Sequence, residues 1–126
     1  METIIMWWNK LILACALIFH ATAYTQEAKC PAYHDRTPLY GADIDDGKVD
    51  LSNETMEPDF SRGEGDNQYG YYRVEDIFDA GHVLYLVCRY GNRDSKNTVI
   101  VKVSKRVNRC SYRRHPGGRP AEFSCK

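Results

Sequence analysis

Four cysteines spread along a short chain constrain its fold more than any other feature. They are Cys30, Cys88, Cys110 and Cys125, and all of them follow an apolar leader that contains Cys15. Four cysteines in a small exported domain indicate two disulfides, which stabilise a fold whose hydrophobic core is small. Zinc is the competing use, but no two of the four have the short spacing of structural zinc ligands. Three pairings are possible, and we favour Cys30 with Cys125 and Cys88 with Cys110.

The leader predicts export. Residues 11–19 form an unbroken apolar run, and Ala21 and Ala23 are the small residues that a signal peptidase reads. The run is shorter than the roughly 20 residues that span a bilayer. A buried N-terminal helix and a lipidated Cys15 are the alternatives, but too few apolar residues precede Cys15 for lipoprotein export. We therefore expect residues 1–23 to be a signal peptide and residues 24–126 to be one disulfide-bonded domain.

The hydrophobic pattern of the domain is typical of β-strands. Residues 82–90 and 97–103 are rich in β-branched and aliphatic side chains, and a short polar connector between them predicts a hairpin. We expect further strands at residues 48–51, 69–74, 107–112 and 122–125. One or two helical turns are expected at 74–80, extended chain at 37–41, a turn at 45–47 and a long loop at 53–67. The fold class is mainly β, a small antiparallel sandwich or partial barrel stapled by two disulfides.

Charge is distributed unevenly along the chain. Residues 24–85 contain fourteen acidic and five basic side chains, whereas residues 86–126 contain two acidic and eleven basic ones. Such a division can create a dipole that steers charged partners. We favour the simpler outcome, in which the two halves pair with each other on folding, because small domains mix their segments closely.

No catalytic constellation can be named. His34, His82 and His115 lack the spacing that puts two imidazoles on one metal. There is no nucleophile elbow, and paired cysteines leave no thiol to attack a substrate. Residues 43–50 are acidic around Gly47, but they do not match a calcium-binding loop. We therefore predict a protein that is not an enzyme and has no cofactor, with a weak calcium site at 43–50 left open.

Two charged segments are candidate binding sites. The acidic loop at 53–67 contains Glu57, Asp59, Glu64 and Asp66, and the basic stretch at 102–114 ends in Arg113 and Arg114. The simpler interpretation of the basic stretch is a solvated strand face. Its functional interpretation is a surface for an anionic envelope component or an acidic protein. Export argues against nucleic acid as the partner.

The order of cysteines and strands resembles a family of small exported bacterial proteins whose function is uncharacterised. The likeness rests on the opening Cys30-Pro31, the acidic residues 57–59, a tyrosine-rich strand, the strand at 86–90 and the closing residues 123–125. The resemblance implies a periplasmic location and assigns no catalytic residue. Relatives in that family tend to have Trp where Tyr71 or Tyr72 stands here.

These observations predict an exported binding protein without enzymatic activity. The most concrete hypothesis is a periplasmic inhibitor or immunity protein, whose acidic loop is attracted to the basic cleft of a cell-wall-degrading enzyme. The alternative is an envelope-associated domain that uses its basic residues against anionic glycan or lipid headgroups. We expect a periplasmic or extracellular protein partner and at most surface contact with a membrane; a hydrolase with an unrecognised site is a third class.

Overall fold

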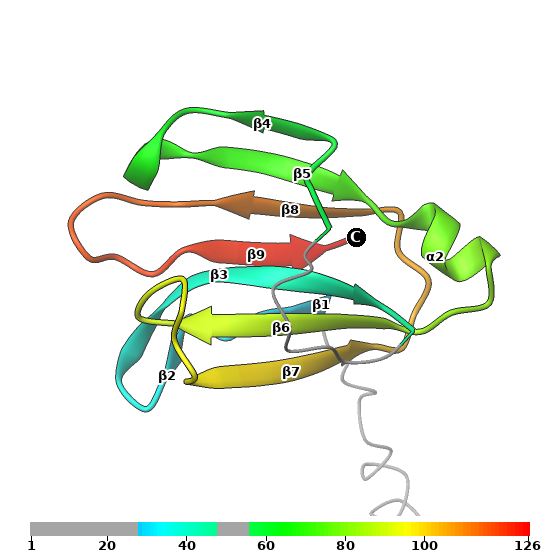
Figure 1. Cartoon of the computed structure of the whole chain (residues 1–126), viewed down its shortest axis with the longest axis horizontal. Helices are drawn as coiled ribbons and strands as arrows, with labels where there is room; N and C mark the ends of the chain where they lie inside the picture. Colours follow the sequence, from blue (N-terminus) through cyan, green and yellow to red (C-terminus); the bar gives the residue numbers. More distant parts are fainter. Residues whose placement is uncertain (1–27, 48–55) are drawn as a thin grey trace, which may run out of the picture.

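A computed structural model describes residues 28–47 and 56–126 and contains two antiparallel sheets (Figure 1). The predicted signal peptide, the strand expected at 48–51 and part of the suggested calcium loop lie outside these residues. The five-stranded sheet has the order β1-β9-β8-β5-β4, and the four-stranded sheet has the order β2-β3-β6-β7. The expected β-rich, two-sheet fold is confirmed; its strands are β1 (Ala28–Lys29), β2 (Tyr33–His34), β3 (Thr37–Asp46), β4 (Phe60–Arg62), β5 (Tyr69–Arg73), β6 (Leu84–Tyr90), β7 (Thr98–Val103), β8 (Arg109–Arg113) and β9 (Glu122–Cys125).

The predicted hairpin forms one half of the four-stranded sheet, with β6 inside the sheet and β7 at its edge. β6 pairs with β7 in a register that sets Leu84 opposite Val103 and Leu86 opposite Val101. Leu84, Leu86 and Tyr90 are buried, because alternate side chains of β6 face the other sheet. A short helix, α2 (Glu75–Asp79), follows β5 within the expected range, and its Ile77 joins the core.

Two segments contain more strand than the sequence indicated. β3 continues through the expected turn as far as Asp46, because it pairs with β6 along its length and buries Ile44 in the core. The chain turns at Gly47, which has a positive φ of 88°. The predicted loop at 53–67 contains β4 and the 3-10 turn η1 (Gly65–Asn67), since the ring of Phe60 stacks on the ring of Tyr71 in β5.

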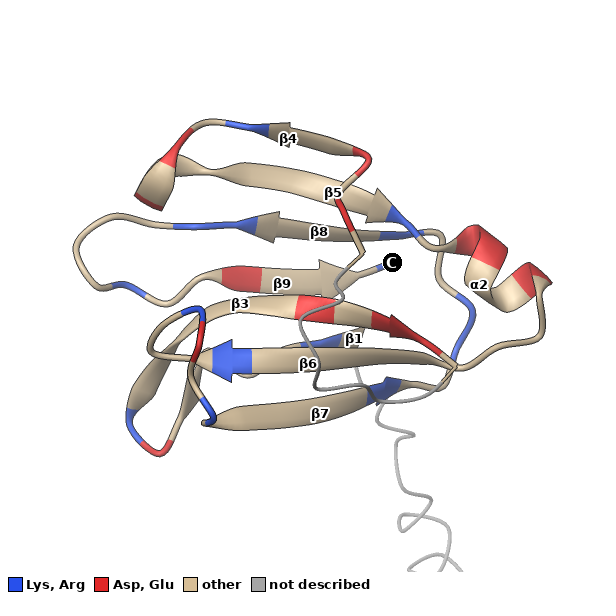
Figure 2. Cartoon of the chain, viewed as in Figure 1, with Lys and Arg blue, Asp and Glu red and all other residues tan. Residues whose placement is uncertain are grey.

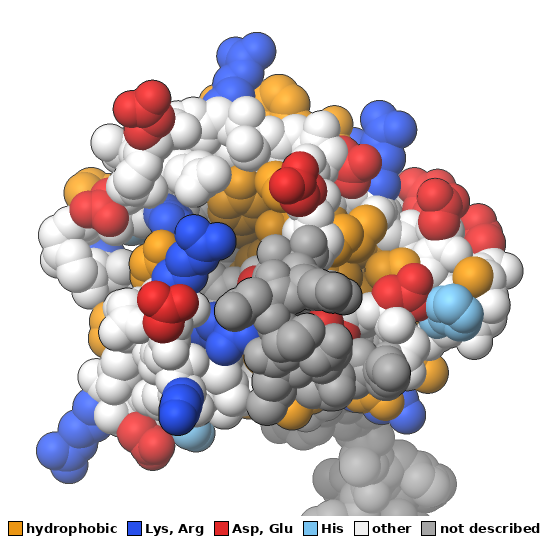
Figure 3. Space-filling model, in the orientation of Figure 1, with side chains coloured by type: hydrophobic (Ala, Val, Ile, Leu, Met, Phe, Trp, Pro, Cys, Tyr) orange, Lys and Arg blue, Asp and Glu red, His pale blue; other side chains and the backbone are white. Residues whose placement is uncertain are grey.

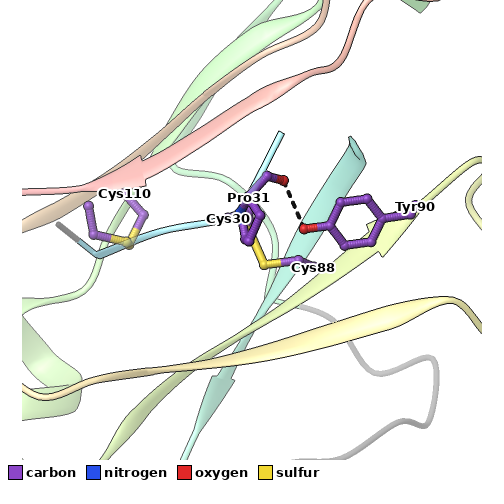
Figure 4. The surroundings of a disulfide bond; sticks show 6 residues. Cys30, Pro31, Cys88, Tyr90 and Cys110 are labelled. Atoms are coloured by element: carbon purple, nitrogen blue, oxygen red, sulfur yellow. Dashed lines mark hydrogen bonds between the residues drawn. A yellow bond between two sulfur atoms is a disulfide. The ribbon is translucent and has the colours of Figure 1, made fainter. Parts of the chain in front are cut away.

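The favoured disulfide pairing is wrong. The structure joins Cys30 to Cys88 and Cys110 to Cys125 (Figure 4). The register of β8 and β9 sets Cys110 directly opposite Cys125, with 3.9 Å between their Cα atoms. The pairing follows from which strands are neighbours and not from a need to tie the ends of the domain together.

The two disulfides have different places in the fold. Cys30 follows β1 of the five-stranded sheet and Cys88 lies in β6, so their bond joins the two sheets. The Cys110–Cys125 bond stays within the five-stranded sheet. The hydroxyl of Tyr90 donates a 2.8 Å hydrogen bond to the carbonyl of Pro31 beside the inter-sheet disulfide. Together these contacts anchor the start of the domain to β6.

The two charge halves of the sequence interleave in the fold, as expected. β4 and β5 of the acidic half share a sheet with β8 and β9 of the basic half (Figure 2). Arg89 pairs with Asp43 at 2.8 Å, and Arg106 pairs with Asp79 at 2.7 Å. The division along the sequence therefore does not become a simple division of the molecule. No helix in the described part of the chain is long and apolar enough to cross a membrane.

Candidate binding surface

The outer face of the five-stranded sheet combines arginine and aromatic side chains. Side chains alternate between the faces of a strand, and Tyr72, Tyr112 and Phe123 face the core, so their strand neighbours face outward. The strand register arranges those neighbours in three rows across the sheet. We call this surface the arginine–aromatic face; its rows are Arg62, Tyr69, Arg113 and Glu122, then Phe60, Tyr71, Ser111, Ser124 and Lys29, then Arg73 and Arg109.

Arginine side chains stack on the aromatic rings of this face. The guanidinium carbon of Arg109 lies 3.9 Å from the ring centre of Tyr71, and that of Arg113 lies 4.6 Å from the ring centre of Tyr69. Phe60 stacks on Tyr71 with 5.4 Å between ring centres and 15° between planes. A guanidinium that lies on a ring keeps N–H groups at its edge for other acceptors. The face therefore presents flat rings and directed hydrogen-bond donors together.

Positive charge on this face is largely uncompensated. Arg73 and Arg109 are direct cross-strand partners, and like charges in that position destabilise a sheet. Within residues 28–47 and 56–126, no ion pair to a carboxylate is made by Arg62, Arg109 or Arg113. The outward carboxylate of the first row, Glu122, accepts a 3.0 Å hydrogen bond from His115. An anionic ligand would relieve this repulsion.

A shallow hollow follows the middle of the arginine–aromatic face. Its volume is about 440 Å³, which is within the range of ligand-binding clefts. Phe60, Tyr69 and Tyr71 line one side of the hollow, and Ser111, Ser124 and Glu122 line the other. A ligand in the hollow would contact aromatic rings on one flank and small hydroxyl groups on the other.

The two arginines proposed from the sequence as binding residues lie in different places. Arg113 lies on the arginine–aromatic face, whereas Arg114, the next residue, places its guanidinium 4.1 Å from the ring centre of Tyr40. Tyr40 belongs to β3 of the other sheet. The two arginines therefore do not form one site.

The acidic residues of the predicted loop are also divided. Glu57 and Asp59 precede β4, and Glu64 and Asp66 follow it, so a strand separates the two pairs. The carboxylate of Asp59 accepts a 2.6 Å hydrogen bond from the backbone N–H of Arg73. The structure thus gives one of these acidic residues a role in fixing β4 against β5.

The histidines are bound to separate neighbours. His34 contacts the side chain of Asn97 at 2.6 Å, His82 pairs with Asp46, and His115 pairs with Glu122. Among the described residues, no three His, Cys, Asp or Glu side chains could hold a metal ion together.

Of the residues on the arginine–aromatic face, only Arg113 was among the binding residues predicted from the sequence. The alternation of Tyr69 with Tyr71 and of Arg109 with Arg113 is a usable signal, because residues two apart share a face. The sequence does not add Phe60 and Arg62 to this face, since the composition of residues 53–67 indicates a loop and the register of β4 is visible only in the structure.

The fold and this surface define a small, disulfide-bonded, two-sheet β domain with a basic aromatic sheet face. Comparison with models of known protein families, with curated protein sequences and with solved structures gives no match.

Proposed function

We propose that this protein is an exported, non-enzymatic binding protein whose arginine–aromatic face binds an anionic glycan of the cell envelope. The observation that carries the proposal is the stacking of Arg109 on Tyr71 and of Arg113 on Tyr69, on a face with little compensating negative charge. Two disulfides suit an oxidising compartment outside the cytosol. The resemblance to small periplasmic proteins supports the envelope as the place of action.

The chemistry of the face suits an acidic sugar polymer. Sugar rings have faces of C–H groups that pack against apolar surface, and Phe60, Tyr69 and Tyr71 supply three adjacent rings whose parts not covered by arginine are exposed. Arginine binds carboxylate and phosphate groups through two parallel N–H donors. The sheet spans four strand spacings, or about 19 Å, so several sugar units can lie across it. A polymer can thereby combine many weak contacts into useful affinity.

An inhibitor of a basic hydrolase is the competing function, and the geometry supports it less. That function requires a continuous acidic surface, whereas β4 separates Glu57 and Asp59 from Glu64 and Asp66. Asp59 is also held by the backbone of Arg73. We therefore favour the glycan and treat capture of an enzyme as the opposing outcome of the test.

The test compares binding to polygalacturonate with binding to uncharged dextran, by affinity electrophoresis of protein obtained by exporting the full chain. We expect retardation by polygalacturonate alone, decreasing steeply as salt rises because exposed charges are screened. The double variant Arg109→Gln/Arg113→Gln should weaken binding at least tenfold. The matched control is Lys102→Gln/Lys105→Gln, which removes the same charge from exposed positions outside the face.

Two results would contradict the proposal. One is equal weakening by both double variants, which would mean that net charge alone drives binding. The other is stoichiometric capture of a basic cell-wall hydrolase from periplasmic extract, abolished by charge reversal at Glu57, Asp59, Glu64 and Asp66 and unaffected by Arg109→Gln/Arg113→Gln. That pattern would support the inhibitor function.

A further inference from the structure

A second cavity lies on the opposite side of the five-stranded sheet, between that sheet and β3. β2 pairs only with Thr37 and Pro38, so in the described part of the chain the remainder of β3 has a strand neighbour on one side alone. The inner side of β5 faces this edge across a cleft of about 560 Å³. Figure 3 shows hydrophobic side chains gathered in the hollow between the two sheets, with basic side chains beside them.

The wall of the cleft contains a fixed ion pair. Arg89 donates a 2.8 Å hydrogen bond to Asp43, and their side chains are only 16% and 25% exposed. Each charge is therefore already compensated in a partly desolvated setting. A ligand therefore does not need to supply a cation for Asp43. Because Asp43 pairs with Arg89, it does not neutralise the other arginines of the cleft.

Arg114 is positioned to receive an anion. Its guanidinium lies on the ring of Tyr40, and its backbone N–H donates a 2.8 Å hydrogen bond to the carbonyl of Gln68. Arg93 lines the same cleft. Within the described ranges neither Arg114 nor Arg93 pairs with a carboxylate. The acid Asp94 lines the cleft as well, so the three arginines and two acids of the lining leave an excess of one positive charge, and Arg114 is free of an ion pair to a described carboxylate.

The inner end of the cleft is aromatic. A smaller cavity of about 150 Å³ shares Tyr40, Tyr72 and Arg114 with the cleft and extends to Tyr112 and Phe123. The ring centre of Tyr72 lies 5.9 Å from the ring centre of Tyr112 and 6.0 Å from that of Phe123. The hydroxyl of Tyr72 is a hydrogen-bond donor at neutral pH, as in any tyrosine. The cavity therefore has a basic mouth and an aromatic interior.

We propose that this cleft binds a small organic anion, whose acidic group contacts Arg114 and whose apolar body packs against Tyr72 and Phe123. A carboxylate and a phosphate share the chemistry that Arg114 recognises. The site is distinct from the arginine–aromatic face, because Arg113 and Arg114 lie on opposite sides of the sheet. It accordingly does not depend on glycan binding.

The test is an NMR titration of ¹⁵N-labelled protein, produced by exporting the full chain, with phenylacetate, glycerol 3-phosphate, inorganic phosphate and the neutral phenylacetamide. We expect phenylacetate to shift the amide signals of Gly41, Gln68 and Tyr72, and phenylacetamide to bind at least tenfold more weakly. A response to glycerol 3-phosphate and inorganic phosphate but not to phenylacetate would assign the acidic group as phosphate and would contradict the apolar body of the ligand. Absence of shifts at these amides with every anion would overturn the proposal.

Neighbouring residues provide a matched pair of variants. Arg114→Gln should weaken binding of the preferred anion by about tenfold to a hundredfold, as loss of a charged hydrogen-bond donor does. Arg113→Gln removes the same group from the opposite face and should leave the titration unchanged. If Arg114→Gln does not fold, Tyr72→Phe keeps the ring, removes the hydroxyl donor and should weaken binding severalfold. Unchanged affinity in the folded cleft variant, or equal loss in Arg113→Gln, would overturn the assignment.

Discussion

The two faces of the five-stranded sheet use similar residue types for opposite purposes. On the inner face, Tyr72, Tyr112 and Phe123 contact one another and the core. On the outer face, Phe60 and Tyr71 form a similar ring contact but remain partly exposed. Arginine covers the outer rings where the second sheet covers the inner ones. Aromatic content alone therefore does not separate a core from a binding surface.

Consecutive residues divide between the two faces. Tyr71 and Tyr72 lie on opposite sides of β5, and Arg113 and Arg114 diverge in the same way at the end of β8. A substitution at one residue of each pair should therefore affect stability and binding differently from the same substitution at its neighbour.

The largest expected difference between the faces concerns stability. Phe123 is 3% exposed, and Phe123→Ala should lower the free energy of unfolding by about 3–5 kcal/mol, through lost burial and a remaining cavity. Tyr71→Ala on the outer face should lower it by less than about 1 kcal/mol while weakening binding to polygalacturonate. Urea unfolding at pH 7 measures both values. Equal losses in the two variants would show that the outer rings are part of the core.

A smaller effect depends on alkaline pH. The pKa of Tyr72 is raised to about 12, mainly by burial and further by the negative charge of Tyr112 and Asp43, while Arg114 lowers it. An unfolded tyrosine loses its proton near pH 10. The folded protein therefore binds more protons than the unfolded chain between pH 10 and 12, and its stability falls as pH rises through that window.

Replacing Tyr72 should reduce this pH dependence. The shift of two units corresponds to less than about 2.7 kcal/mol, and partial exposure reduces the effect to about 1 kcal/mol. Tyr72→Phe should flatten the fall by that amount in urea unfolding measured between pH 9 and pH 12. Burial also raises the pKa of Tyr90, so some dependence should remain. Tyr69→Phe, on the outer face, serves as the control, and an identical flattening there would contradict the interpretation.

The smallest expected effect is a gain in stability. Arg73 lies directly opposite Arg109, and Arg73→Gln should raise the free energy of unfolding by about 0.2–0.5 kcal/mol at low salt by removing this repulsion. The same variant should bind polygalacturonate more weakly. Arg62→Gln is the control, because its cross-strand partner is Tyr69. A loss of stability in Arg73→Gln would argue that the outer face is not strained by its charge.

Apolar content and the bounding turn residues predict the strands that contribute buried side chains to the core. Residues 82–90 correspond to β6, which is buried along most of its length, and residues 122–125 correspond to β9, which buries alternate side chains. β4 could not be predicted, because it has only three residues and a single apolar side chain, Phe60. Its strand conformation depends on pairing with β5. The turn expected around Asp45 was overridden by the pairing of β3 with β6.

The candidate site was less accessible to sequence reasoning than the fold. Arg113 was identified as part of a basic stretch, but the stretch itself divides between two faces and cannot act as a unit. The arginine–aromatic face combines residues from β4, β5 and β8, which are brought together by strand register. Register is a property of pairs of strands, and the single sequence contains no direct record of it.

The disulfide pattern has a consequence for the order in which the domain can assemble. Each bond joins cysteines that are consecutive in residues 28–126, Cys30 with Cys88 and then Cys110 with Cys125. A chain that crosses a membrane from its N-terminus exposes them in that same order. An oxidant outside the membrane that takes two electrons and two protons from each cysteine and the next one to emerge gives the native pairs without thiol–disulfide reshuffling. The first bond can close while β8 and β9 are still behind the membrane, so maturation can proceed in step with translocation.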